Sequence, residues 1–207
     1  MSEEAERAVE RAARDSYGRL LAYVSSRCRD LQASEDALAD AFHSALVQWP
    51  RIGVPTRPEG WLLTVARRRL IDRARRVRVA EAALMSPLLE AEGHARSDEN
   101  FPDERLKMLF LCAHPAIHPS VRTPLMLQTV LGFNAAQIAS AFLIQPSAMG
   151  QRLSRAKTKI RDARIRFELP ELDQLPARLD AVLDAIYAAY GSGWDRVAGG
   201  ERQRGLA

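Results

Sequence analysis

Apolar residues recur at helical spacing in one segment after another, and prolines and glycines separate these segments. Over residues 5–30, for example, Tyr17, Leu20, Leu21 and Val24 fall on one helical face. Aromatic residues make up only 6% of the chain, which favours helix over strand. The pattern therefore predicts an all-α protein, and a length of 207 residues allows one or two domains.

The expected helices form two groups around an acidic segment. In the first group, helices are predicted at 5–30, at 34–48 with Ser34 as the N-cap and Trp49-Pro50 as the stop, and from Pro58 to about Arg78. Residues 81–104 carry seven acids and one arginine, which favours a linker with at most a short helix at 80–90. Further helices are predicted at about 102–113, 119–131, 135–142, 146–166 and 177–190.

The expected organisation is two small helical domains joined by an acidic linker. The first domain is a helical bundle at 5–79, the linker covers 80–101, and the second domain covers 102–168. A C-terminal segment follows at 169–207.

The second domain has a helix-turn-helix pattern: a short helix, a turn at 143–145 and a longer basic helix. In the longer helix, Met149, Leu153, Ala156 and Ile160 share the face that is expected to be buried. The opposite face is polar, and residues 147–166 contain seven basic residues and one acid. Such a helix can lie in the major groove of DNA, where flanking cations hold phosphates. The candidate DNA-contacting residues are Ser147, Gly150, Gln151, Arg152, Ser154, Arg155, Lys157 and Lys159.

Gly150 is small because glycine has no Cβ, so a DNA backbone could approach the helix closely there. The alternative interpretation of this helix is a solvated cationic face without a ligand.

The first domain ends in an arginine-rich helix, with seven arginines and one acid over residues 67–78. A helical wheel buries Leu62, Leu63, Ala66 and Leu70 and places Trp61, Thr64, Arg68 and Arg75 on the opposite side. A base can stack on an exposed aromatic ring while arginine holds phosphate, which suits a separated DNA strand. The alternative is a packed Trp61 with arginines that only increase solubility.

The helix at 34–48 carries acids away from its apolar stripe. Glu35, Asp36 and Asp40 are the candidates, and the two aspartates share a face because they are four residues apart. An acidic face in a chain of net charge +4 is a candidate docking surface for a basic protein partner. An ordinary solvated face is the alternative.

Other functional classes find little support. Cys112, His114 and His118 lie close in sequence, but they match no zinc or nucleophile motif, so packing and a structural hydrogen bond are expected. No catalytic residue, metal or cofactor is predicted. The N-terminus is acidic without an apolar run, and no stretch approaches ~20 apolar residues, so neither a signal peptide nor a membrane span is expected.

Two parts of the chain resemble extracytoplasmic-function (ECF) sigma factors. Ser34–Phe42 and Gly60–Arg76 resemble the second conserved region of that family, and residues 137–157 resemble the fourth region. The resemblance implies a cytoplasmic transcription initiation factor that binds core RNA polymerase and promoter DNA. Asp36 and Asp40 would dock on the β′ clamp helices of the polymerase. The 61–76 helix, including Arg67 and Arg76, would open the minus-10 element, and the 147–159 helix would read the minus-35 element.

One subgroup of ECF factors is more similar. Residues 101–106 and 112–116 resemble factors that carry a long C-terminal helical-repeat extension, and residues 175–183 resemble its start. The chain departs from the family at Arg68, where asparagine is usual, and from the subgroup at Ala113, where cysteine is usual. The extension would end at Ala207, as in a truncated or naturally short form that lacks regulation through it. An anti-sigma factor would be the other route to regulation.

Two further functions stay open. A stand-alone helix-turn-helix regulator would explain the second domain but not the tryptophan–arginine helix, and such regulators usually dimerise. A helical scaffold would bind no DNA even at low salt. A separate hypothesis, from charge alone, is that the acidic linker folds back on a basic helix through Glu90, Glu92, Asp98 and Glu99.

Overall fold

A computed structural model describes residues 3–80 and 101–204, with side chains described for 3–76 and 101–190. Within these ranges the chain forms eight helices and no strand, which confirms the all-α prediction for the described residues. Residues 81–90 of the predicted helix at 80–90 and the four acids of the proposed self-inhibiting linker lie outside them. The chain divides into two compact units, Met1–Glu104 and Arg105–Ala207.

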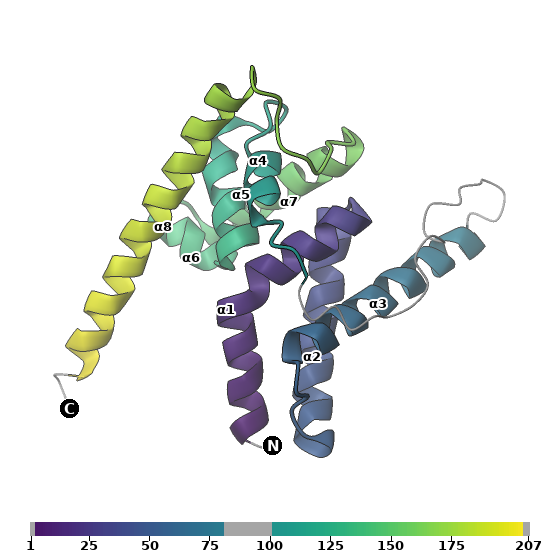
Figure 1. Ribbon diagram of the computed structural model, residues 1–207. Helices are drawn as coiled ribbons and strands as arrows, with labels where there is room; N and C mark the ends of the chain where they lie inside the picture. Colours follow the sequence, from purple (N-terminus) through teal and green to yellow (C-terminus); the bar gives the residue numbers. More distant parts are fainter. Residues whose placement is uncertain (1–2, 81–100, 205–207) are drawn as a thin grey trace. The chain divides into compact units, whose positions relative to one another are not determined.

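The first unit is built from three helices, α1 (Glu3–Cys28), α2 (Leu31–Ile52) and α3 (Pro58–Ala80), each of which packs on the other two (Figure 1). Their shared core is apolar and buried. Burial of apolar side chains provides the main driving force for such packing. The buried residues include Leu20 and Leu21 of α1, Leu38 and Trp49 of α2, and Leu62 and Ala66 of α3.

Both predicted ends of α2 are wrong. The helix begins three residues before Ser34, because the Asp30 side chain accepts a hydrogen bond from the Ala33 N–H at 3.0 Å and acts as the N-cap. Ser34 is buried inside the first turn, where its hydroxyl donates to the Asp30 carbonyl. At the other end α2 continues through Pro50 and stops before Gly53, whose φ of 83° leaves the helical region.

The first unit also includes Phe101, which packs against α1. The centroids of the Phe101 and Tyr23 rings are 5.2 Å apart. The Cζ atom of Arg19 lies over the Phe101 ring, 4.1 Å from its centroid. Arg19 also donates to the Phe101 carbonyl at 2.6 Å. A cation over an aromatic face and a charge-assisted hydrogen bond together hold this residue on α1.

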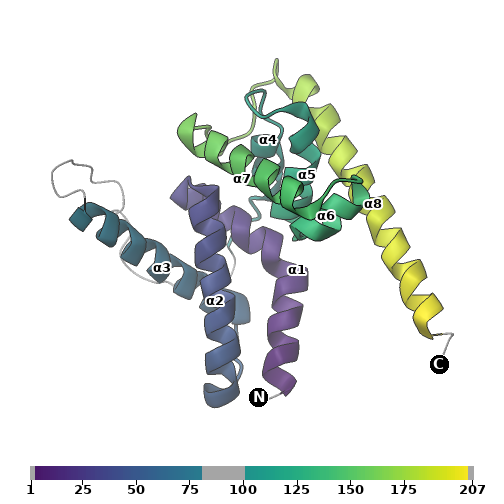
Figure 2. The same ribbon diagram turned by 180° about the vertical axis from the view of Figure 1, so that it is seen from behind.

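The second unit contains α4 (Arg105–Cys112), α5 (Pro119–Leu131), α6 (Ala135–Ala141), α7 (Pro146–Asp162) and α8 (Leu175–Arg204). Helix α5 packs on α4, α7 and α8, while α6 lies beside α7 (Figure 2). The predicted start of α4 near 102 is wrong by three residues, and α8 is longer than the predicted 177–190. The predicted buried face of α7, Met149, Leu153, Ala156 and Ile160, is confirmed.

The turn between α6 and α7 is tightly hydrogen-bonded. Asn134 and Gln137 form the capping box that begins α6. At its end Leu143 adopts φ 53°, and the Ile144 N–H donates to the Ala139 carbonyl at 2.9 Å, as in a Schellman motif. The predicted extension of α7 to Arg166 is wrong, because Arg164 takes a left-handed conformation (φ 49°) and ends the helix at Asp162.

Candidate nucleic-acid and partner interfaces

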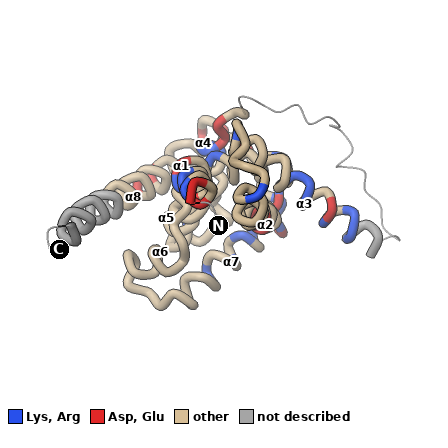
Figure 3. The backbone as a smooth tube through the Cα atoms, turned by 90° about the horizontal axis from the view of Figure 1, so that it is seen from below, with Lys and Arg blue, Asp and Glu red and all other residues tan. Residues whose placement is uncertain are grey.

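Cationic residues recur along helix α3 (Figure 3). Arg67, Arg68, Arg75 and Arg76 are all exposed, as expected for residues that could meet a phosphate backbone. Thr64 is half-buried and its hydroxyl donates to the Gly60 carbonyl of the previous turn. The helix therefore keeps its arginines accessible while its threonine is engaged within the helix.

Trp61 does not stand free in solvent as the helical wheel suggested. Its ring is half-buried and meets the Trp49 ring edge-on, with centroids 5.5 Å apart and planes at 68°. Such edge-to-face pairs are favourable beyond simple area burial. Trp49 is 1% exposed and is thus a support for Trp61 that sequence reasoning missed, since it had been expected to end α2.

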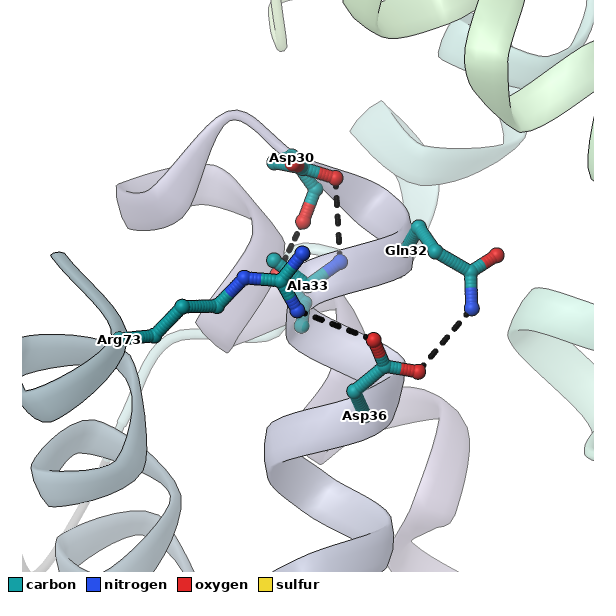
Figure 4. A network of polar contacts seen from close by, with 6 residues as sticks. Asp30, Gln32, Ala33, Asp36 and Arg73 are labelled. Carbon is teal, nitrogen blue, oxygen red and sulfur yellow. Dashed lines mark hydrogen bonds and ion pairs between the residues drawn. The ribbon is translucent and has the colours of Figure 1, made fainter. Parts of the chain in front are cut away.

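The acidic face of α2 is paired with α3 (Figure 4). A guanidinium nitrogen of Arg73 lies 3.1 Å from Asp36 Oδ2, and Gln32 donates to the other oxygen of the same carboxylate. One turn along, Arg69 Nε lies 3.7 Å from Asp40 Oδ2. Arg69 and Arg73 were absent from the predicted site. Ion-pair partners so far apart along the chain become visible only when the two helices are packed together.

Glu35 lies apart from the two aspartates. Its side chain is half-buried and its Oε1 atom is enclosed, whereas Asp36 and Asp40 are exposed. It lies close enough to Tyr17 of α1 that its charge adds to the effect of burial, and both raise the pKa of the tyrosine. The structure therefore does not bring Glu35 onto the exposed acidic face where it was predicted.

Helix α7 places its predicted reading residues on one exposed side. Ser147, Gln151, Ser154 and Arg155 are exposed, and so are the flanking Arg152 and Lys159. Amide and guanidinium groups of this kind can pair with adenine and guanine edges. A Cβ added at Gly150 would meet no atom within 4 Å, so packing within the chain does not require glycine at this position.

Lys157 is an exception among the predicted contacts of α7. It is 6% exposed, and it follows the buried Ala156 on the core side of the helix. The structure therefore does not bring this ammonium group to the exposed face with Arg155 and Lys159. A wheel that counts only charge places every cation outside, whereas a lysine stem can run along apolar surface.

In the second unit, Cys112 and His114 make polar contacts with other residues of the same unit. Cys112 is buried with its sulfur 3.6 Å from the Thr129 hydroxyl, and His114 Nδ1 accepts a hydrogen bond from the Ala116 N–H. Burial, followed by the charges of Arg178 and Arg122, lowers the pKa of His114. Among the residues whose side chains are described, no group of three or more possible metal ligands is found. Within residues 3–80 and 101–204 no helix is both long and apolar enough to span a membrane.

The tryptophan pair and the acid–arginine pairs lie in a region whose sequence is similar to a known family. Residues 13–79 match Sigma-70 region 2. The match covers the second half of α1, all of α2 and nearly all of α3. The match supports membership of the chain in the sigma factor family.

A curated protein is similar over most of the chain. The chain is 36% identical over 192 residues to an uncharacterized protein of Rhizobium meliloti (strain 1021). The alignment covers 89% of this chain but 44% of that protein, so the chain spans less than half of the relative's length. No solved structure matches the chain significantly.

Proposed function

We propose that the chain is a transcription initiation factor of the ECF type, which binds core RNA polymerase and directs it to promoters. The observation that carries the proposal is the Sigma-70 region 2 match over α1–α3. The same helices bear the acid pair of α2 and the arginines of α3. Action on polymerase would place the chain in the cytoplasm, and its role would be to bind and position DNA without catalysing a reaction.

The polymerase contact is proposed for Asp36 and Asp40. Both carboxylates are exposed on one face of α2, and their pairing with arginines of α3 means that this face already accepts cations. Complementary charge speeds association and selects partners. A basic surface on the β′ clamp helices is the proposed partner.

The promoter contacts are proposed for α3 and α7. On α3, the exposed part of the Trp61 ring would stack with a base of the opened minus-10 element while Arg68 and Arg75 hold phosphates. On α7, Gln151 and Arg155 would read base edges of the minus-35 element in the major groove. The predicted helix-turn-helix of α6 and α7 would supply the docking geometry.

The deciding experiment is binding of the purified chain to core RNA polymerase, with Asp36→Arg/Asp40→Arg as the test variant. Reversal of two charges at the contact should abolish binding, because like charges across an interface cost several kcal/mol. A matched control is Glu10→Arg/Asp15→Arg, which makes the same charge change at exposed positions of α1. The control should bind as the wild type does, and circular dichroism should show that both variants stay folded.

A chain that binds duplex DNA but not polymerase would contradict the proposal. That result would favour the stand-alone helix-turn-helix regulator, which reads DNA without the acidic face of α2. The mass in solution then gives a second criterion, since such regulators are commonly dimers on palindromic sites.

A further inference from the structure

The two ion pairs between α2 and α3 form a short ladder. Asp36 and Asp40 are four residues apart on α2, and their partners Arg73 and Arg69 are four apart on α3, in the opposite order along the chain. All four side chains remain about half exposed, between 48% and 61%. Exposed pairs of this kind are weak and readily exchanged. Leu38 of α2 and Leu62 and Ala66 of α3 are buried, so apolar packing stabilises the contact of the two helices in addition to the ion pairs.

The same arginines border the predicted DNA-binding face of α3. Arg69, Arg73 and Arg76 follow one another at spacings of four and three residues, which makes a continuous row along the helix. Arg76, one of the predicted strand contacts, lines the same groove as both ion pairs. A DNA strand that reaches Arg76 would therefore pass close to the two arginines that now face α2.

We propose that Arg69 and Arg73 are two further DNA-binding residues. Their ion pairs with Asp36 and Asp40 keep them from binding DNA while no partner occupies the acidic face. The proposal rests on the proposed function, because the same two aspartates are the polymerase contact. A basic partner that takes over the carboxylates leaves both guanidinium groups to bind phosphates of a single strand. By linkage, single-stranded DNA and the partner then strengthen each other's binding.

The first arm of the test needs DNA alone. Fluorescence anisotropy measures the affinity of the full chain for a labelled single-stranded oligonucleotide over a range of salt concentrations. Asp36→Asn/Asp40→Asn should raise the affinity at low salt about two- to tenfold, the range expected from releasing two weak ion pairs. Two additional phosphate contacts should also steepen the slope of log K against log salt by about 1.4, at roughly 0.7 per contact.

The matched control is Glu3→Gln/Glu10→Gln on α1. These two glutamates are also exposed and paired, with Arg7 and Arg14, so the variant makes the same change in net charge. It should give a smaller gain and an unchanged slope, because α1 lies outside the predicted DNA-binding face. Equal gains in both variants would mean that net charge alone sets the affinity for the oligonucleotide, and that the ion pairs of Arg69 and Arg73 do not limit it.

The second arm identifies the arginines. Arg69→Gln/Arg73→Gln should lower the affinity more when it is added to Asp36→Asn/Asp40→Asn than when it is made in the wild-type chain, which a double-mutant cycle measures as a coupling. Equal losses in the two backgrounds would overturn the proposal, since the arginines would then be available from the start. Thermal melts by circular dichroism exclude misfolding. Because no polymerase is present, failure of polymerase binding would leave these oligonucleotide results intact, so the two proposals can fail separately.

Discussion

Helices α3 and α7 are both rich in cations, with seven basic residues on α3 and five on α7, but they lie in different electrostatic surroundings. On α3, Arg69 and Arg73 face carboxylates that belong to a neighbouring helix. On α7, an ion pair joins Arg161 to the adjacent Asp162, in the last turn and away from Gln151 and Arg155. A ligand that reaches Arg69 and Arg73 must therefore compete with existing ion pairs, whereas the predicted reading face of α7 is exposed as it stands.

The difference separates two kinds of binding. A helix whose cations are already paired gains less from phosphate, because each new contact replaces an old one and only the surplus appears as affinity. A helix with exposed cations gains the full effect of counterion release. We therefore expect α3 to respond to the state of α2, and α7 to bind duplex DNA regardless of it.

The largest expected effect concerns the support under α3. Trp49→Ala removes a ring that is 1% exposed and packs edge-on against Trp61, so it leaves a cavity beneath the predicted stacking residue. Such truncations typically cost about 3–5 kcal/mol of unfolding free energy. Urea denaturation of the wild type and the variant gives the difference.

The matched comparison for this prediction is Trp61→Ala, which removes the half-buried partner ring. It should destabilise the chain less than Trp49→Ala while weakening single-strand binding more than any loss of stability explains. An equal stability loss in both variants would mean that Trp61 is chiefly a core residue, and the proposed stacking role would lose its basis.

An intermediate effect is expected on α7. Arg152→Gln/Lys159→Gln removes two exposed cations that flank the reading face. The slope of log K against log salt for a duplex of arbitrary sequence should fall by about 1.8, at roughly 0.9 per lost phosphate contact. The control is Arg164→Gln/Arg166→Gln, which removes two exposed cations just beyond the helix. Similar slopes in the two variants would show that duplex binding depends on net charge and not on α7.

The parts of this structure that could be predicted from sequence depend on neighbours along the chain. The spacing of Met149, Leu153 and Ile160 already defines one face of a helix, and Asn134, directly before the predicted helix at 135–142, has the side chain of an N-cap. Asp30 was missed as the cap of α2, because Ser34 has equal chemistry and lies nearer the apolar stripe.

The parts that could not be predicted depend on how helices pack. Asp36 and Arg73 are 37 positions apart, and only the contact of α2 with α3 makes them partners. The same holds for the edge-on contact of Trp61 with Trp49, since a helical wheel treats α3 as if it stood alone. Lys157 shows the related limit that a charged side chain can be buried. The DNA and polymerase contacts of these residues stay predictions.

The smallest expected effect also distinguishes best between a passive and a ligand-binding α7. Gly150 lies inside the helix, and a Cβ there would meet nothing within 4 Å, so Gly150→Ala should stabilise the chain by about 0.5–1 kcal/mol through helix propensity alone. If a DNA backbone approaches α7 at this point, the added methyl group should nevertheless weaken duplex binding. Thermal denaturation and duplex titration of the same preparation therefore should move in opposite directions. A gain in stability with unchanged duplex affinity would show that the glycine makes no close contact with DNA, and the predicted docking of α7 would have to be turned away from Gly150.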